Sequence, residues 1–137
     1  MTVYVFKLTT GEEIIGVVEN SLLPNDEYYN IIDPMHIMGS RDENGSMGMR
    51  LRDATLLSED NMFTIANKYV VTYYKPVPQF ANYYLKAAEY ARKYTKPMIM
   101  NQIEESVKDI ERDIAEEEEH SQQIGDILRR ITGSTLQ

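Results

Sequence analysis

The chain has 137 residues, a formal net charge of -8 and no cysteine. That length suits one ordinary domain with an appendage, and the lack of Cys excludes a disulfide framework and favours a cytoplasmic protein. Nonspecific nucleic-acid binding depends on Lys and Arg that neutralise phosphates, so the acidic balance argues against duplex DNA as a partner. No segment approaches the roughly 20 apolar residues of a membrane-spanning helix, so no membrane association is expected.

Residues 1–19 are predicted to form a β-hairpin. Residues 3–9 and 12–19 are rich in apolar and β-branched side chains, and Gly11 between them supplies the positive φ of a tight turn. Gly16 interrupts the second strand, and a glycine inside a strand often marks a bulge or a bend. We therefore expect the sheet to curl at Gly16.

A third strand is expected over residues 28–38 and a fourth over residues 47–57. Pro34 lacks the N–H group that a strand ladder uses, so it should lie at a bulge or on a free edge. Segment 39–45 is dense in turn-forming residues and predicts a long hairpin loop. Apolar and basic residues then alternate in the fourth strand, as in a strand with one buried face.

Residues 62–65 and 68–74 are the last extended segments of the predicted sheet. Short strands at close turn spacing favour a small barrel over a doubly wound sheet. The predicted fold class is therefore mainly β. It consists of a small, strongly bent five-stranded barrel over residues 1–78, followed by C-terminal α-helices.

Residues 79–96 are predicted to form an amphipathic helix that is rich in aromatic residues and has the only basic balance in the chain. Pro76 and Pro78 mark the change from the strand period to the helical period. Its recurrent apolar positions are Phe80, Tyr84, Ala87, Ala91 and Tyr94. Residues 95–97 (Thr-Lys-Pro) are expected to break this helix.

Residues 97–137 are predicted to be a long acidic helical extension with heptad spacing. The seam positions, separated alternately by three and four residues, are Met100, Ile103, Val107, Ile110, Ile114, Glu117, Ser121, Ile124, Leu128 and Ile131. A helix over residues 98–131 would be roughly 50 Å long. A helix of this length is too long to fold back on the small barrel. Its seam should therefore meet another helix, from a neighbouring subunit or the preceding segment. A frayed, partly disordered acidic tail is the alternative.

Residues 3–75 resemble the Sm-like (Sm/Lsm) family. Residues 8–19 (LTTGEEIIGVVE) look like its first motif, in which a hairpin glycine precedes a strand with a bend-forming glycine. Residues 26–32 (DEYYNII) are similar to the stretch that closes that motif. The branch encoded by tailed phages of marine and cyanobacterial hosts is indicated by YNIIDPMHIMG, MFTIANKYVVTYYKP and QFANYYLKAAEYA.

The resemblance implies a site for single-stranded RNA. It assigns Tyr28 as a ring that stacks on a base, Asn30 as a group that hydrogen-bonds a base edge, and Asn67 with Lys68 as the partner loop. Here residues 66–68 (Ala-Asn-Lys) replace the family's Arg-Gly before the last strand. The alternative is that Tyr28 packs at a strand entry and Asn30 satisfies a turn.

Assembly into a closed ring is also expected. A bent sheet leaves two unpaired edges, and a subunit that pairs one edge with its neighbour's other edge removes both. The resemblance implies that the fourth strand (residues 47–57) meets the fifth strand (residues 68–74) of the neighbour in a ring of about five to seven subunits. The expected contact residues are Met49, Leu51, Val70, Val71, Ile103, Val107, Ile110 and Ile114.

No catalytic residues, metal site or cofactor are predicted. His36 and His120 belong to different segments, and the acidic run 116–119 spreads its carboxylates around a helix axis. The chain has no phosphate-binding loop, dinucleotide fingerprint or nucleophile elbow. The sequence thus predicts a non-enzymatic ring that acts as an interaction scaffold for a phage or host protein, in the host cytoplasm or a virion. A ring that binds single-stranded RNA is the alternative.

Overall fold

The computed structural model describes residues 1–135, with side chains up to Gly133. The chain divides into two compact units, Met1–Lys96 and a second unit that starts at Pro97.

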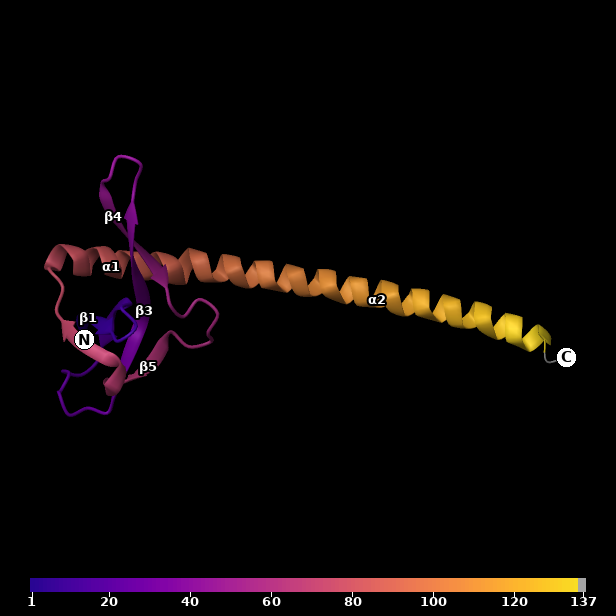
Figure 1. Cartoon of the computed structure of the whole chain (residues 1–137), viewed down its shortest axis with the longest axis horizontal. Coiled ribbons are helices and arrows are strands. Elements are labelled where there is room, and N and C mark those ends of the chain that lie inside the picture. Colours follow the sequence, from indigo (N-terminus) through magenta and orange to yellow (C-terminus); the bar gives the residue numbers. More distant parts are fainter. Residues whose placement is uncertain (136–137) are drawn as a thin grey trace. The chain divides into compact units, whose positions relative to one another are not determined.

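The first unit contains one antiparallel sheet of six strands (Figure 1). The strands are β1 (Thr2–Leu8), β2 (Glu13–Val18), β3 (Tyr28–Arg41), β4 (Met47–Asp53), β5 (Met62–Ala66) and β6 (Val70–Tyr74). Their order is β4-β3-β2-β1-β6, and β5 pairs with the first part of β3. The predicted hairpin of β1 and β2 is confirmed, and Gly11 in its turn has a φ of 90°.

The long strand β3 is bent by a bulge. The pairing of β2 with β3 shifts at Gly16, so that Asp33 and Pro34 lie opposite this single glycine. Asp33 adopts a φ of 50°. A Cβ atom at Gly16 would lie 2.1 Å from the Cγ2 atom of Ile31, so no larger residue fits without a shift of β3. Of the two positions predicted for Pro34, a bulge or a free edge, the structure shows the bulge, and this bulge lies opposite Gly16, where the sheet was expected to bend.

The sheet curls around an aromatic core. The buried side chains on its inner face are Tyr4, Phe6, Val18, Tyr29 and Ile31. The rings of Tyr29 on β3 and Tyr73 on β6 have centroids 5.8 Å apart, although β2 and β1 lie between these strands. Three strand spacings in a flat sheet would separate them by about 14 Å. The strong bend that the sequence predicts is thus present.

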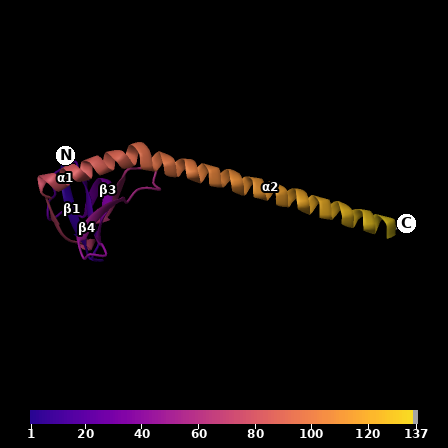
Figure 2. The same ribbon diagram turned by 90° about the horizontal axis from the view of Figure 1, so that it is seen from above.

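The outer face of the sheet is covered by α1 (Pro78–Tyr90), which continues as the π-helical segment η2 (Ala91–Thr95). Figure 2 shows α1 along one side of β1, β3 and β4. Tyr84 and Ala88 of this helix pack on Val5, Ile15 and Met35 of the sheet. Pro78 opens the helix, where its missing N–H group costs no hydrogen bond.

Three features of the predicted fold class are not confirmed: the mainly β content, the five strands and the closed barrel. The chain is 44% helical, so it is not mainly β. The sheet has six strands instead of the five expected, because residues 62–66 and 70–74 form two separate strands, β5 and β6, with residues 67–69 as a short 3-10 helix between them. The fourth strand also ends earlier than expected, at Asp53. Strand β3 also extends to Arg41, because the carboxylate of Asp42 accepts hydrogen bonds from the N–H groups of Asn44 and Ser46 and closes a shorter hairpin loop. Among the described pairings, none joins β6 to β4 or β5, so barrel closure remains a prediction.

From Pro97 onward, α2 (Lys96–Thr135) forms the second unit and contains the predicted helical residues 98–131. The predicted break at residues 95–97 is wrong, because the backbone stays helical through this segment. The N–H group of Lys96 donates to the carbonyl oxygen of Ala91, and this wider π turn precedes Pro97, which has no N–H to donate. α2 has the length to cross a bilayer but is too charged, and no other helix of residues 1–135 qualifies as a membrane span.

Candidate functional site

A groove of about 680 Å³ lies beside the start of β3, next to the segment that follows β2. Its apolar lining includes Leu22, Leu23 and Met62. The charged residues of the lining are Glu19 and Asp26, and no Lys or Arg is among the described residues that form it. The groove therefore offers apolar surface and hydrogen-bonding groups, but its charge does not favour a phosphate.

Tyr28 and Asn30 both line this groove. Because side chains alternate along a strand, these two residues share one face of β3, and the Tyr28 side chain is 61% exposed. The hydroxyl of Thr64 on β5 donates to Oδ1 of Asn30 at 2.7 Å. The side-chain carbonyl of Asn30 thus has one of its two lone pairs used within the sheet, which leaves the other lone pair and the amide nitrogen for a base edge.

Asn67 is used within the fold. Its Nδ2 atom donates to the carbonyl oxygens of Pro24 and Asp26, at 3.1 and 2.7 Å, and to the hydroxyl of Tyr29 at 2.8 Å. An amide group has two hydrogens, so these acceptors use its full donor capacity. The contacts join the segment after β2 to the short 3-10 helix η1 (Asn67–Tyr69), which precedes β6.

Lys68 lies outside the groove as well. Its Nζ atom is 5.1 Å from the centroid of the Tyr69 ring, within cation–π range. The structure therefore brings Tyr28 and Asn30 together in one groove, whereas Asn67 and Lys68 do not line it. The predicted four-residue RNA site is divided between two places.

The residues predicted for the subunit contact also divide into two groups. Leu51 packs on the outer core beneath α1, and Val70 packs on the inner aromatic core. Met49 on β4 is 58% exposed and Val71 on β6 is 62% exposed. These two residues lie on the terminal strands of the sheet, where a neighbouring strand could pair.

The predicted seam of α2 is exposed along its length. Ile103, Val107, Ile110 and Ile114 retain between 42% and 57% of their accessible surface. A shallow trough along the middle of the helix is lined by Ile110 and Ile114 together with Asp113, Glu117 and Glu118. The seam therefore combines apolar side chains with carboxylates.

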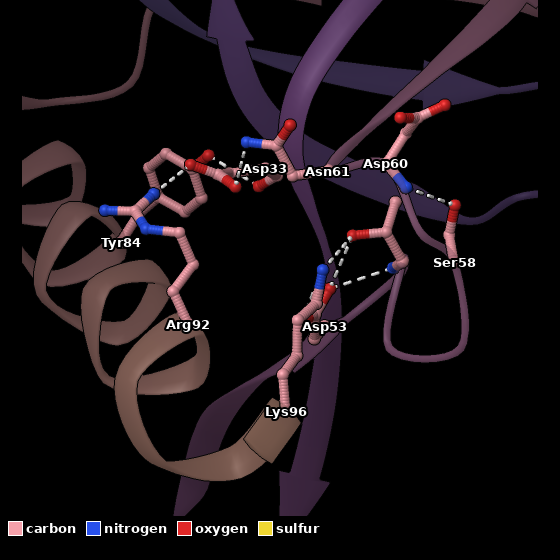
Figure 3. Close-up of polar contacts among 9 residues, drawn as sticks. Asp33, Asp53, Ser58, Asp60, Asn61, Tyr84, Arg92 and Lys96 are labelled. Atoms are coloured by element: carbon pink, nitrogen blue, oxygen red, sulfur yellow. Dashed lines mark hydrogen bonds and ion pairs between the residues drawn. The ribbon is translucent and has the colours of Figure 1, made fainter. Parts of the chain in front are cut away.

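A polar network around Asp33, which the sequence did not predict, attaches the β3 bulge to α1 and η2 (Figure 3). The Asp33 carboxylate accepts hydrogen bonds from Arg92 and, at 3.0 Å, from the amide of Asn61. The hydroxyl of Tyr84 donates to the backbone carbonyl of Asp33 at 2.6 Å. Burial and, second, the nearby Asp33 carboxylate raise the pKa of Tyr84 well above its ordinary value.

A second network lies below the first in Figure 3, where Lys96 reaches toward Asp53. The N–H and hydroxyl groups of Thr55 donate to Oδ1 of Asp53 at 2.8 and 3.0 Å, and Lys96 donates to the Thr55 hydroxyl at 3.2 Å. Because its proton is directed to a carboxylate and its oxygen accepts from an ammonium group, this hydroxyl is held in place and not activated. The contacts attach the loop after β4 to Lys96, the residue that follows η2.

Among residues 1–133, no three His, Asp or Glu side chains are placed to hold a metal ion. The buried side-chain nitrogens and oxygens described by the structure all have hydrogen-bond partners. A comparison of the chain with protein-family models and with curated proteins finds no match. The described features of the chain that could serve a function are the groove, the sheet edges and the α2 seam.

Proposed function

We propose that this chain is a non-enzymatic, ring-forming Sm-like subunit that acts as a protein-interaction scaffold. The observation that carries the proposal is the exposed apolar seam of α2. A helix on its own is only marginally stable in water, and helices in proteins gain most of their stability by packing an apolar face against a partner. A helix of 40 residues that exposes such a face is suited to bind another protein.

The ends of the strand order support assembly into a ring. β4 and β6 occupy the two ends of the sheet, and these are the strands that the Sm-like resemblance expects to pair between subunits. Exposed Met49 and Val71 lie on them. Pairing β4 of one subunit with β6 of the next would satisfy the free edges of these two strands in a ring of about five to seven subunits.

The family resemblance gains support from the hairpin glycine, the bend at Gly16 and the curled sheet. If the chain belongs to the phage branch, its partner is a phage or host protein, in the host cytoplasm or in a virion. The bound α2 would then link the ring to that partner.

Light scattering of the full-length protein tests the ring. One chain has a mass of 15.9 kDa, and we expect a mass about five to seven times larger at micromolar concentration. Val71→Asp should lower this mass, because a charge on an edge strand opposes pairing. Val77→Asp is the matched control, since Val77 is 63% exposed but lies outside the strands. A monomeric wild-type protein would contradict the ring.

Binding of single-stranded RNA is the second candidate, favoured by the exposed Tyr28 ring beside Asn30 in the groove. Short U-rich and A-rich RNAs titrated at low salt test it. If RNA binds in the groove, Tyr28→Ala should weaken binding by on the order of tenfold or more, as expected for the loss of one stacked base. Tyr90→Ala is the control, since Tyr90 is 62% exposed on α1. Equal effects of the two variants would reject the groove as the RNA site.

A further inference from the structure

We infer that the α2 seam receives a basic amphipathic helix of another protein and not the α2 helix of a second copy. The inference deepens the proposed scaffold function and rests on it, because it states the chemistry of the partner. It follows from the charges beside the seam.

Residues beside a heptad seam pack along the edge of the partner helix and determine which partner fits. The charged residues at these flanking positions of α2 are Glu104, Glu111, Asp113 and Glu118, all exposed. The only other titratable group there is His120. Over residues 96–133, the flanks of the seam therefore carry acidic groups and no Lys or Arg.

Lys96, the first residue of α2, pairs with Asp53, and the basic residues of α2 beyond it lie away from the seam. They are Lys108, Arg112, Arg129 and Arg130. Arg112 pairs with Asp109 at 3.5 Å, and Arg129 pairs with Asp126 at 2.7 Å, and both acids also lie on the outer side of the helix. These cations are thus placed to serve the outer face and not a partner at the seam.

A second copy of α2 would bring acids together in either orientation. In a parallel pair, Asp113 of one helix faces Glu118 of the other, and in an antiparallel pair each flank meets a flank of the same kind. Glu117 also occupies a seam position. In a parallel assembly it would stack against its own copies, and a buried, unpaired carboxylate is costly.

A partner with Lys or Arg on both sides of its own apolar seam removes these conflicts. Each flanking acid then meets a cation, and a Lys or Arg opposite Glu117 pairs with it. The apolar stretch from Met100 to Ile114 supplies the continuous contact that packing needs. The charge pattern selects a basic helix, and the apolar seam holds it.

Two designed peptides test the inference on the full-length protein. Both have Ile and Leu at the seam, and one has Lys at every flanking position and opposite Glu117, whereas the other has Glu there. Isothermal titration should show binding of the basic peptide and none of the acidic peptide. The affinity should fall as salt is added, because partly exposed ion pairs are screened. A scrambled basic peptide of the same composition should not bind.

Two charge-reversed variants separate the flanks from the overall acidity. The flank variant combines Glu104→Lys, Glu111→Lys, Asp113→Lys and Glu118→Lys. The control variant makes the same net change on the outer face with Glu105→Lys, Asp109→Lys, Glu116→Lys and Glu119→Lys. The flank variant should bind the basic peptide on the order of tenfold more weakly and should gain binding of the acidic peptide, whereas the control should keep the wild-type preference. Far-ultraviolet circular dichroism verifies that α2 stays helical in both.

Three results would overturn the inference: no binding of the basic peptide to the wild-type protein, equal losses in the two variants, or equal binding of the two peptides. Self-association that Ile110→Asp abolishes, without binding of the basic peptide, would assign the seam to a second copy. Light scattering on the same samples tests the ring independently of peptide binding. A wild-type monomer that still binds the basic peptide contradicts the ring and not the partner.

Discussion

The two units of this chain treat their apolar side chains in opposite ways. In residues 1–96, Phe6, Ile15 and Ile31 are fully buried within one subunit, and the charged groups Arg92 and Lys96 pair with acids on the sheet. In α2, the apolar seam remains exposed, and ion pairs such as Arg112 with Asp109 join residues within the same helix. The first unit uses its side chains for its own fold, whereas α2 leaves its apolar seam exposed.

This difference means that the same kind of substitution has different consequences in the two units. In the first unit it should change the free energy of unfolding of the chain itself. On α2 it should change binding and leave the first unit unaffected. The ten tyrosines all lie at or before Tyr94, so tyrosine signals report on the first unit alone. Far-ultraviolet circular dichroism is dominated by α2, the longest helix.

The largest expected contrast comes from changing isoleucine to alanine in each unit. Ile15→Ala should lower the free energy of unfolding of the first unit by about 2–5 kcal/mol, because it leaves a cavity beside Tyr84. Ile103→Ala should leave that free energy unchanged, since Ile103 is 42% exposed. Chemical denaturation followed by near-ultraviolet circular dichroism of the tyrosines measures both. A loss for Ile103→Ala comparable to that for Ile15→Ala would contradict the division between the units.

The elements that sequence reasoning predicted are those with local signals. Gly11 and Gly16 mark the first hairpin and its bend, and Pro34 marks the bulge, because each restricts or frees the backbone at its own position. The heptad spacing identified the α2 helix because it is also a local signal, carried by residues three and four positions apart. It did not distinguish a helix end at Pro97 from the π turn that precedes it, because both accommodate the missing N–H group.

The side-chain networks had no such local signal. Arg92 and Asp33 are 59 positions apart, and the amide of Asn67 reaches Pro24 across 43 positions. Such contacts depend on how the sheet curls, which pattern and propensity do not specify. The donors of the Asn67 amide are used within the fold in this way, and Asn67 does not line the groove beside Tyr28. Tyr28 and Asn30 could be placed together because they are two residues apart on one strand.

A smaller effect is expected from Tyr84, which joins α1 to the sheet. Burial raises its pKa in the folded state, whereas in the unfolded chain it titrates near pH 10. The corresponding stability is therefore fully present below about pH 10 and is lost as the pH rises above it, by about 1.4 kcal/mol per pH unit. In Tyr84→Phe, the free energy of unfolding should not show this decrease with pH.

The same variant should be less stable than the wild type by about 1 kcal/mol at neutral pH, because the hydrogen bond to the Asp33 carbonyl is lost. The difference should then narrow above about pH 10. Denaturation curves at a series of pH values measure both effects, and Tyr90→Phe on the exposed face of α1 is the control. Parallel pH profiles for the wild type and Tyr84→Phe would show that the Tyr84 hydroxyl is not buried against Asp33.

The smallest contrast concerns two arginines, one in each unit. Arg92 pairs with Asp33, whose side chain is 13% exposed, and Arg112 pairs with Asp109, where both side chains are 68% exposed. Exposed pairs contribute little because water and salt screen them. Arg92→Met should therefore lower the free energy of unfolding of the first unit by about 1 kcal/mol, near the upper end of the range for exposed pairs. A larger loss is not expected, because Arg92 itself is 48% exposed. Arg112→Met should have no measurable effect on that unit.

A double-mutant cycle of Arg92→Met with Asp33→Asn assigns the effect of Arg92 to its pair. Asn is the suitable replacement because, like Asp, it tolerates the φ of 50° at this position, so the cycle removes a charge without straining the bulge. If the pair holds η2 to the sheet, the two losses should not add, because either change alone already breaks the contact. Additive losses would mean that Arg92 stabilises the unit by packing its aliphatic stem. The bulge would then be held to α1 chiefly by the hydrogen bonds of Tyr84.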